Sequence, residues 1–202
     1  MVNSGMGIIL RNYRSIVTDK FIDSLVDSLK LKVRDGIYSY VIVMWLIILQ
    51  RLQQDSGTLK GAVESLRSGP SRDLLEEISG SNRLQRLSGA TGGYSQGRSR
   101  LPLPVVEATV DQINNSIVET ARDAKFKDQK VYVLDGTGLT IQHTEENLSQ
   151  YPQCSTKKTK AHYPLVRMVI ATDAVSRVTL RPAIGAFHGD KAKGESELAM
   201  RI

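Results

Sequence analysis

The feature that most constrains the fold is a change of period at Lys130. Before it, apolar residues recur at helical spacing; after it, Val131–Ile141 is typical of a β-strand. Asp135 lies in the middle of that strand among apolar neighbours, and we predict that the strand is buried. A buried carboxylate is costly unless it is paired, hydrogen-bonded or bound to a metal. Asp135 is therefore the first candidate functional residue, and the small residues after it, Gly136 and Thr137, would let a ligand approach the backbone.

Residues 1–125 are predicted to form a helical domain. Thr18 is placed to cap a helix that we expect to end at Gly36. The apolar run 40–49 is too short to span a bilayer and predicts a central core helix. A third helix, 59–66, should end at Gly69 and the proline after it. Short helices separated by glycine turns are compatible with a helix-turn-helix-like DNA-binding module.

A glycine- and serine-rich stretch, Ser88–Ser99, is predicted to be a loop or flexible connection. Arginines with neighbouring polar side chains suit phosphate and base-edge contacts, although a solvated basic loop is the plain alternative. The candidate DNA-binding residues in and around this stretch are Arg83, Arg86, Gln96, Arg98 and Arg100. Pro104 then fits the first turn of another helix, whose apolar face would run from Val106 to Ala121.

Residues 126–202 are predicted to form a second domain. Two further strands are expected at 164–172 and 177–187, joined by a tight link at 173–176 that makes them antiparallel. A helix should follow at 195–202. The predicted fold class is therefore α+β or α/β: a helical N-terminal domain, then an incomplete RNase H-like mixed sheet of three antiparallel strands and the start of a helix.

Composition narrows the possible partners. The formal charge is +6, which favours an anionic partner such as nucleic acid, but many basic proteins bind none. The single cysteine, Cys154, excludes an internal disulfide and indicates a reducing compartment. We see no signal peptide and expect no membrane role. The histidines His143, His162 and His188 do not have the spacing of a compact zinc site.

Four segments resemble DDE transposases of the insertion-element-four family. Asp135-Gly-Thr, followed by Thr144, Glu146 and Asn147, is similar to the family's first catalytic segment. The other three segments follow the family's order along the chain: 92–102 is similar to a Ser-Gln-Ala-Arg-x-Arg-Leu-Pro stretch, 163–167 to the next strand, and 194–199 to the helix after the third strand. Gly97 departs from the family's alanine, which weakens helix propensity there.

The resemblance implies metal-dependent cleavage and transfer of DNA strands during transposition of an insertion sequence. Three carboxylates would hold two Mg²⁺ (or Mn²⁺) ions, with Asp135 as the first catalytic and metal-binding residue. It also implies binding to terminal inverted repeats, a homodimer in a synaptic complex, and a bacterial cytoplasmic, nucleoid-associated protein. A basic cluster between the first two strands adds phosphate-contact candidates, with a solvated loop as an equal alternative: Lys157, Lys158 and Lys160.

The family's second Asp and its Glu lie beyond the segments matched here, so we expect a C-terminally truncated transposase. With one of three carboxylates, the chain should not bind Mg²⁺ tightly or cut DNA. Acidic residues that might substitute are better explained by turns, loops and helix starts: Asp173, Asp190, Glu195 and Glu197. Two alternatives stay open, a DNA-binding regulator without catalysis and a non-functional remnant whose open sheet would aggregate.

Overall fold

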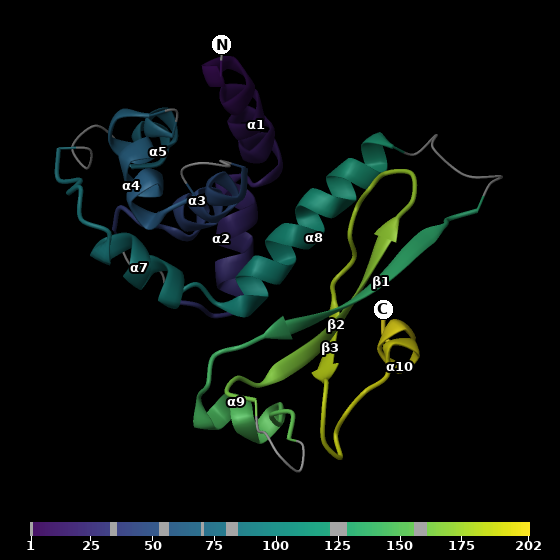
Figure 1. Ribbon diagram of the computed structural model, residues 1–202. Helices are drawn as coiled ribbons and strands as arrows, with labels where there is room; N and C mark the ends of the chain where they lie inside the picture. The colour runs from purple at the N-terminus through teal and green to yellow at the C-terminus, as the bar shows by residue number, and fades with distance from the viewer. Residues whose placement is uncertain are drawn as a thin grey trace. The chain divides into compact units, whose positions relative to one another are not determined.

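The computed structural model describes residues 2–32, 36–52, 57–69, 71–79, 85–121, 129–155 and 161–202. The chain divides into two compact units, Met1–Ile113 and Asn114–Ile202. The predicted boundary at residue 125 lies after the end of helix α8 (Leu103–Thr120), whereas this division lies inside that helix. Each unit is described below by itself (Figure 1).

Helix α3 (Tyr40–Leu52) is the centre of the first unit. Its residues Val41–Leu46 and Leu49 are all buried, and α2, α4 and α7 contact it. Burial on every side of the helix explains why the run is apolar all round rather than amphipathic. The prediction of a central core helix is confirmed.

Helix α2 (Asp19–Ser28) begins at the predicted cap, because the Thr18 Oγ1 accepts a hydrogen bond from the Phe21 amide at 3.2 Å. Its predicted end at Gly36 is wrong. The chain leaves the helix at Lys30, which has a left-handed φ of 52°, and the Leu31 amide donates to the Val26 carbonyl at 2.9 Å. This six-to-one hydrogen bond is a Schellman ending, which here forms without glycine.

Helix α4 (Leu59–Ser68) has the predicted start and end, with Thr58 capping the Gly61 amide and Gly69 following the last turn. Two helices were not predicted individually: α1 (Val2–Ile16) and α5 (Arg72–Ser79). The core joins α3 to the α4–α5 connection through a buried hydrogen-bond chain. The Trp45 Nε1 donates to the Ser71 Oγ at 2.7 Å, and the Ser65 and Ser71 hydroxyls are 2.8 Å apart.

The predicted loop at Ser88–Ser99 is wrong over most of its length, because Gly92–Ser99 forms helix α7. Tertiary packing overrides the low helix propensity of its glycines, since Tyr94 and Gly97 are both buried. The following helix, α8, contains Pro104 in its first turn as predicted. Its residues Val106 and Ile113 pack against the helical core.

The second unit contains a three-stranded antiparallel sheet in the order β1-β2-β3. Its strands are β1 (Tyr132–Thr140), β2 (Leu165–Asp173) and β3 (Ala183–Ala186). The first two agree with the prediction. The third is much shorter than 177–187; Pro182, directly before it, has no amide hydrogen to donate to a ladder. Only an isolated bridge, Thr172 to Thr179, precedes it.

The prediction that the first strand is buried is wrong. All residues of β1 are exposed except Gly136, which is partly exposed. The strand lies at the edge of the sheet with β2 as its described neighbour, and its apolar side chains Val133 and Leu134 keep 57% and 55% of their surface. The apolar pattern therefore marks a strand correctly but does not reveal whether other elements cover it.

The predicted tight link between β2 and the third strand is present. The Asp173 Oδ1 accepts hydrogen bonds from the Val175 and Ser176 amides and from the Ser176 hydroxyl, at 3.0, 2.6 and 2.9 Å. These hydrogen bonds, with those from Ser176 the strongest, lower the pKa of Asp173. Asp173 is therefore a turn residue, as its sequence position suggested, and its carboxylate is already occupied.

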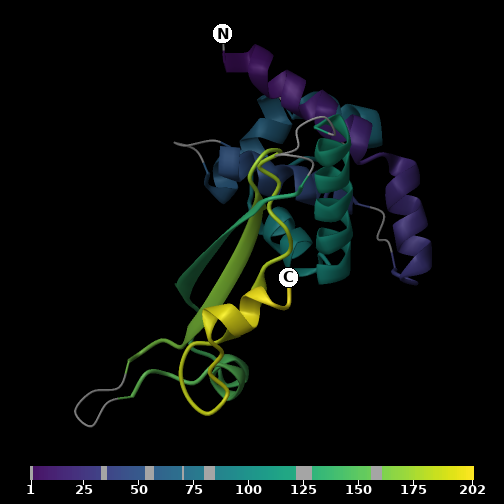
Figure 2. The same cartoon turned by 90° about the vertical axis from the view of Figure 1, so that its right-hand side faces the viewer.

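Two short helices complete the second unit: α9 (Glu145–Gln150), capped by Thr144, and α10 (Glu195–Ala199). Helix α10 packs on β2 and β3, with Leu198 fully buried against the sheet (Figure 2). None of the helices in the described part of the chain combines the length and apolar character that crossing a membrane requires.

Candidate nucleic-acid interface

Helix α7 is held on the helical core by Tyr94. This side chain is fully buried, and its hydroxyl donates to the Gln50 Oε1 at 2.6 Å. Gln50 in turn donates to the Gly57 carbonyl at 2.8 Å, which ties the contact to the start of the α4 region. Burial raises the pKa of Tyr94 to about 12, with nearby Arg98 acting in the opposite direction. The helix is thus fixed by a satisfied, neutral phenol.

Two glycines let α7 approach the core closely. A Cβ at Gly97 would lie 3.0 Å from the Val43 Cγ2 and 3.1 Å from the Tyr38 Cβ, and one at Gly93 would lie 2.7 Å from the Tyr38 Cε2. Residues four apart share a helix face. The glycine pair was therefore a sequence signal for close packing, although Gly97 was interpreted as a helix-weakening departure.

Three of the predicted DNA-binding residues are exposed here: Gln96 and Arg98 within α7, and Arg100 as its C-cap. Gln96 and Arg100 lie four residues apart and share one face. Arg98 lies at the border of the buried face, with its guanidinium carbon 5.8 Å from the centre of the Tyr94 ring, within cation–π range. The three side chains that the sequence proposed are thus presented by one anchored helix rather than by a flexible loop.

The charged residues of the segment that contains α7 all have one sign. From Gln85 to Val106 the sequence contains three arginines, Arg86, Arg98 and Arg100, and no acidic residue. The helix begins at Gly92 without a side-chain cap on its first amides, so its positive dipole end is not neutralised locally. Both features favour an anion beside this helix.

Other predicted contact residues are not gathered there. Arg86 is exposed in the segment before α7. Four candidates lie outside the described residues: Arg83, Lys157, Lys158 and Lys160. The candidate interface at α7 therefore consists of Gln96, Arg98 and Arg100.

Asp135 lies in the exposed strand β1, opposite Ile170 of β2 in the register. Because the Asp135 carboxylate is exposed, water can solvate it and it needs no buried partner. The carboxylate is accessible as an oxygen ligand. It lies on the first of the three antiparallel strands, and helix α10 follows the third.

Sequence reasoning missed the position of Glu195. A Cβ at Gly136 would lie 2.6 Å from the Glu195 Cδ, so the first side chain of α10 rests on the backbone of β1 next to Asp135 in sequence. Successive strand residues point to opposite faces. Gly136 leaves the space that Glu195 occupies, which is a structural reason for glycine at this position.

Metal-binding side chains do not converge in the described residues: no group of three or more His, Cys, Asp or Glu is placed to hold an ion. His143 and His162 stack with their ring centres 5.3 Å apart, and Tyr163 meets His162 edge-on at 4.6 Å. Asp135 offers the hard oxygen that Mg²⁺ prefers, but a two-metal site needs more ligands than these residues supply.

Comparison of the chain with protein-family models, with curated proteins and with solved structures finds no match. The likeness to insertion-element transposases therefore rests on the four sequence segments.

Proposed function

We propose that this chain is part of a DNA transposase of the insertion-element-four type, and that its helical unit binds DNA through the exposed face of α7. The observation that carries the proposal is that three exposed side chains, Gln96, Arg98 and Arg100, lie in or directly after one anchored helix, within a segment that contains no acidic residue. Arginine suits phosphate and guanine, and glutamine suits adenine. A helix held by a buried tyrosine presents such side chains in fixed register.

The second unit supports the same assignment more coarsely. Asp135-Gly-Thr lies in the first of three antiparallel strands, and α10 follows the third, an order compatible with an RNase H-like sheet. In the complete enzyme Asp135 would be one of the carboxylates that hold Mg²⁺, which stabilises the charge that develops during phosphoryl transfer. The described residues do not complete that site, so we assign no catalytic step to them.

The proposal is tested by DNA affinity as a function of salt. Phosphate contacts release counterions, and log K falls with log salt by about 0.9 per contact on duplex DNA. We expect Arg98→Gln and Arg100→Gln each to reduce that slope by about 0.9, which corresponds to roughly fivefold weaker binding at ~0.15 M salt. Gln96→Ala should change preference among sequences while leaving the slope unchanged.

Lys20→Gln is the matched control, because it removes one exposed charge from the acidic helix α2 of the same unit. It should leave both affinity and slope unchanged. Binding of the wild-type chain that is absent, or insensitive to salt, would refute the proposal. So would equal losses in the α7 variants and the Lys20 control.

A further inference from the structure

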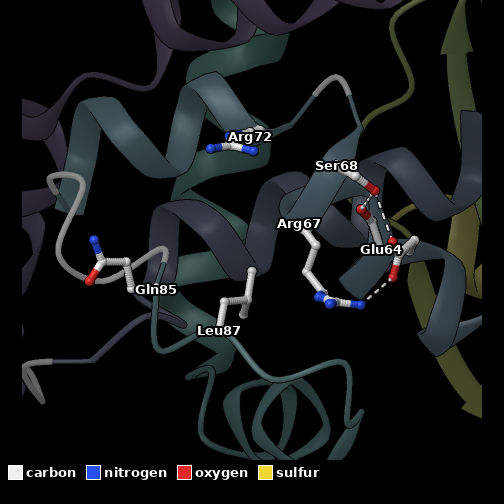
Figure 3. A pocket seen from close by; sticks show the side chains of 6 residues that line it. All are labelled: Glu64, Arg67, Ser68, Arg72, Gln85 and Leu87. Atoms are coloured by element: carbon white, nitrogen blue, oxygen red, sulfur yellow. Dashed lines mark hydrogen bonds and ion pairs between the residues drawn. The ribbon is translucent and has the colours of Figure 1, made fainter.

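A second polar feature of the helical unit lies next to α7. A pocket of about 350 Å³ opens between the end of α4, the start of α5 and the segment that leads into α7 (Figure 3). This volume is at the small end of ligand sites. The lining residues are Glu64, Arg67, Ser68, Arg72, Gln85 and Leu87.

Among the residues that the structure describes, each of the two arginines in this pocket forms a weak intrahelical pair. The Arg67 Nη1 is 3.0 Å from the Glu64 Oε2, three residues earlier, and the Arg72 Nε is 3.1 Å from the Glu76 Oε1, four residues later. All four side chains are about half exposed, where such pairs contribute little to stability. Both guanidiniums can therefore exchange these carboxylates for a stronger anionic partner.

Glu64 already occupies one anion position in the pocket. Its carboxylate accepts hydrogen bonds from the Ser68 hydroxyl at 2.8 Å and from Arg67, as Figure 3 shows. The lining charge is nonetheless positive, with two guanidiniums against this one carboxylate. A phosphate has the geometry to accept bidentate hydrogen bonds from arginine, as the carboxylate does.

The pocket borders the segment that leads into α7. Arg67 lies against the backbone at Gly89, where a Cβ would be 3.2 Å from its Nη1, and α4 contacts α7. Gln85 and Leu87 of the pocket and Gly92 at the start of α7 belong to one short segment. A nucleic-acid strand bound along α7 would thus have a further cationic position beside it.

We propose that Arg67 and Arg72 bind a backbone phosphate of the same DNA, and that Glu64 holds Arg67 in place until the phosphate displaces it. The inference rests on the proposed function, which places DNA on α7. Gln85 lines the same pocket as an additional hydrogen-bond donor.

The test uses the full chain and a short mixed-sequence DNA duplex, with binding followed against salt. Arg67→Gln and Arg72→Gln should each reduce the slope of log K against log salt by about 0.9. Arg201→Gln is the matched control: Arg201 forms a similarly exposed ion pair with Glu197, four residues earlier, at 3.2 Å in the other unit. It should leave the slope unchanged.

Glu64→Gln distinguishes a phosphate site from an ordinary surface ion pair. Removing the competing carboxylate should tighten DNA binding several-fold and raise the affinity of Arg67 for phosphate. Unchanged or weaker binding by this variant, with circular dichroism unchanged, would overturn the inference. Because this variant removes no positive charge, loss of folding in the arginine variants does not prevent the test.

Competition separates the possible sources of the phosphate. Inorganic phosphate at matched ionic strength should displace DNA only weakly if the site needs a backbone held along α7. Strong displacement by inorganic phosphate would instead identify a free-phosphate site and contradict the inference. Failure of wild-type DNA binding refutes the proposed function itself, whereas normal binding with unaltered slopes in both arginine variants refutes only this second contact.

Discussion

At the scale of single residues, small side chains have two structural roles in the helical unit. A glycine leaves room for two elements to pack closely, and a serine accepts the hydrogen bond of a buried donor. Gly97 allows α7 to approach Tyr38 and Val43, and Ser71 accepts the hydrogen bond of a fully buried tryptophan. Neither role was predicted from the sequence. The partners lie far away along the chain, 26 residues in the case of Ser71 and Trp45.

Gly97→Ala should destabilise the helical unit. Overpacking costs ~1–3 kcal/mol, whereas the better helix propensity of alanine returns up to about 1 kcal/mol, so we expect a net loss of about 1 kcal/mol. Gly92→Ala, in the same helix with nothing within 4 Å of its Cβ, should cause no loss. Denaturant unfolding followed by the fluorescence of the only tryptophan, Trp45, measures both. Equal stability of the two variants would show that α7 does not pack as described.

Ser71→Ala should be more damaging than Ser65→Ala. Without the Ser71 hydroxyl, the buried indole N–H of Trp45 loses its acceptor, and an unsatisfied buried donor costs about 1–3 kcal/mol. Ser65→Ala leaves the hydrogen bond between Trp45 and Ser71 intact. The same unfolding experiment compares them, and a larger effect of Ser65→Ala would contradict the assigned hydrogen-bond chain.

At the scale of elements, the sequence predicted those that local patterns specify and missed those that packing specifies. The Thr18 cap, the apolar run of α3 and the turn at Asp173 follow from nearby residues. Helix α7 does not, because its composition is that of a loop and its stability comes from Tyr94 and Gly97. Likewise the pattern of β1 specifies a strand, but exposure depends on neighbours that no local pattern encodes.

The anchoring of α7 predicts a loss of stability at high pH. Burial raises the pKa of Tyr94 to about 12, above the unfolded value of about 10, so the native state holds this proton where the unfolded chain releases it. Stability from this group is complete below about pH 10 and declines as the pH rises towards about 12. Unfolding monitored at Trp45 should show that decline, and Tyr94→Phe should make it less steep. A part of the decline should remain, because burial also raises the pKa of Tyr13 and Tyr38. An equally steep decline in Tyr94→Phe would assign the effect to other groups.

The exposed edge strand predicts aggregation that a charge can suppress. Val133→Lys places a lysine on β1 where 57% of the side chain is exposed, so it should raise the solubility of the full chain without unfolding it. Val166→Lys, at a valine of β2 that is 4% exposed, should instead disrupt the sheet. Light scattering and circular dichroism compare the two, and no gain from Val133→Lys would mean that the β1 edge does not drive association.

At the scale of the whole molecule, the net charge of +6 is not evenly spread. Helix α2 carries three aspartates, whereas the charged residues of the segment 85–106 are all arginines. The candidate residues Gln96, Arg98 and Arg100 were proposed from residue type and order, and the structure shows that they are exposed. The anchoring of α7 could not be predicted, because it depends on packing against distant residues. The neighbouring pocket of Arg67 and Arg72 could not be predicted either, because it is formed by α4, α5 and the segment that leads into α7.

The most direct test is amide hydrogen exchange of the full chain with and without a mixed-sequence DNA duplex. Binding along α7 predicts new protection concentrated at residues 92–100, which weakens as salt is raised. Protection confined to the second unit, with residues 92–100 exchanging as they do in the free chain, would contradict the central claim that α7 is the nucleic-acid interface.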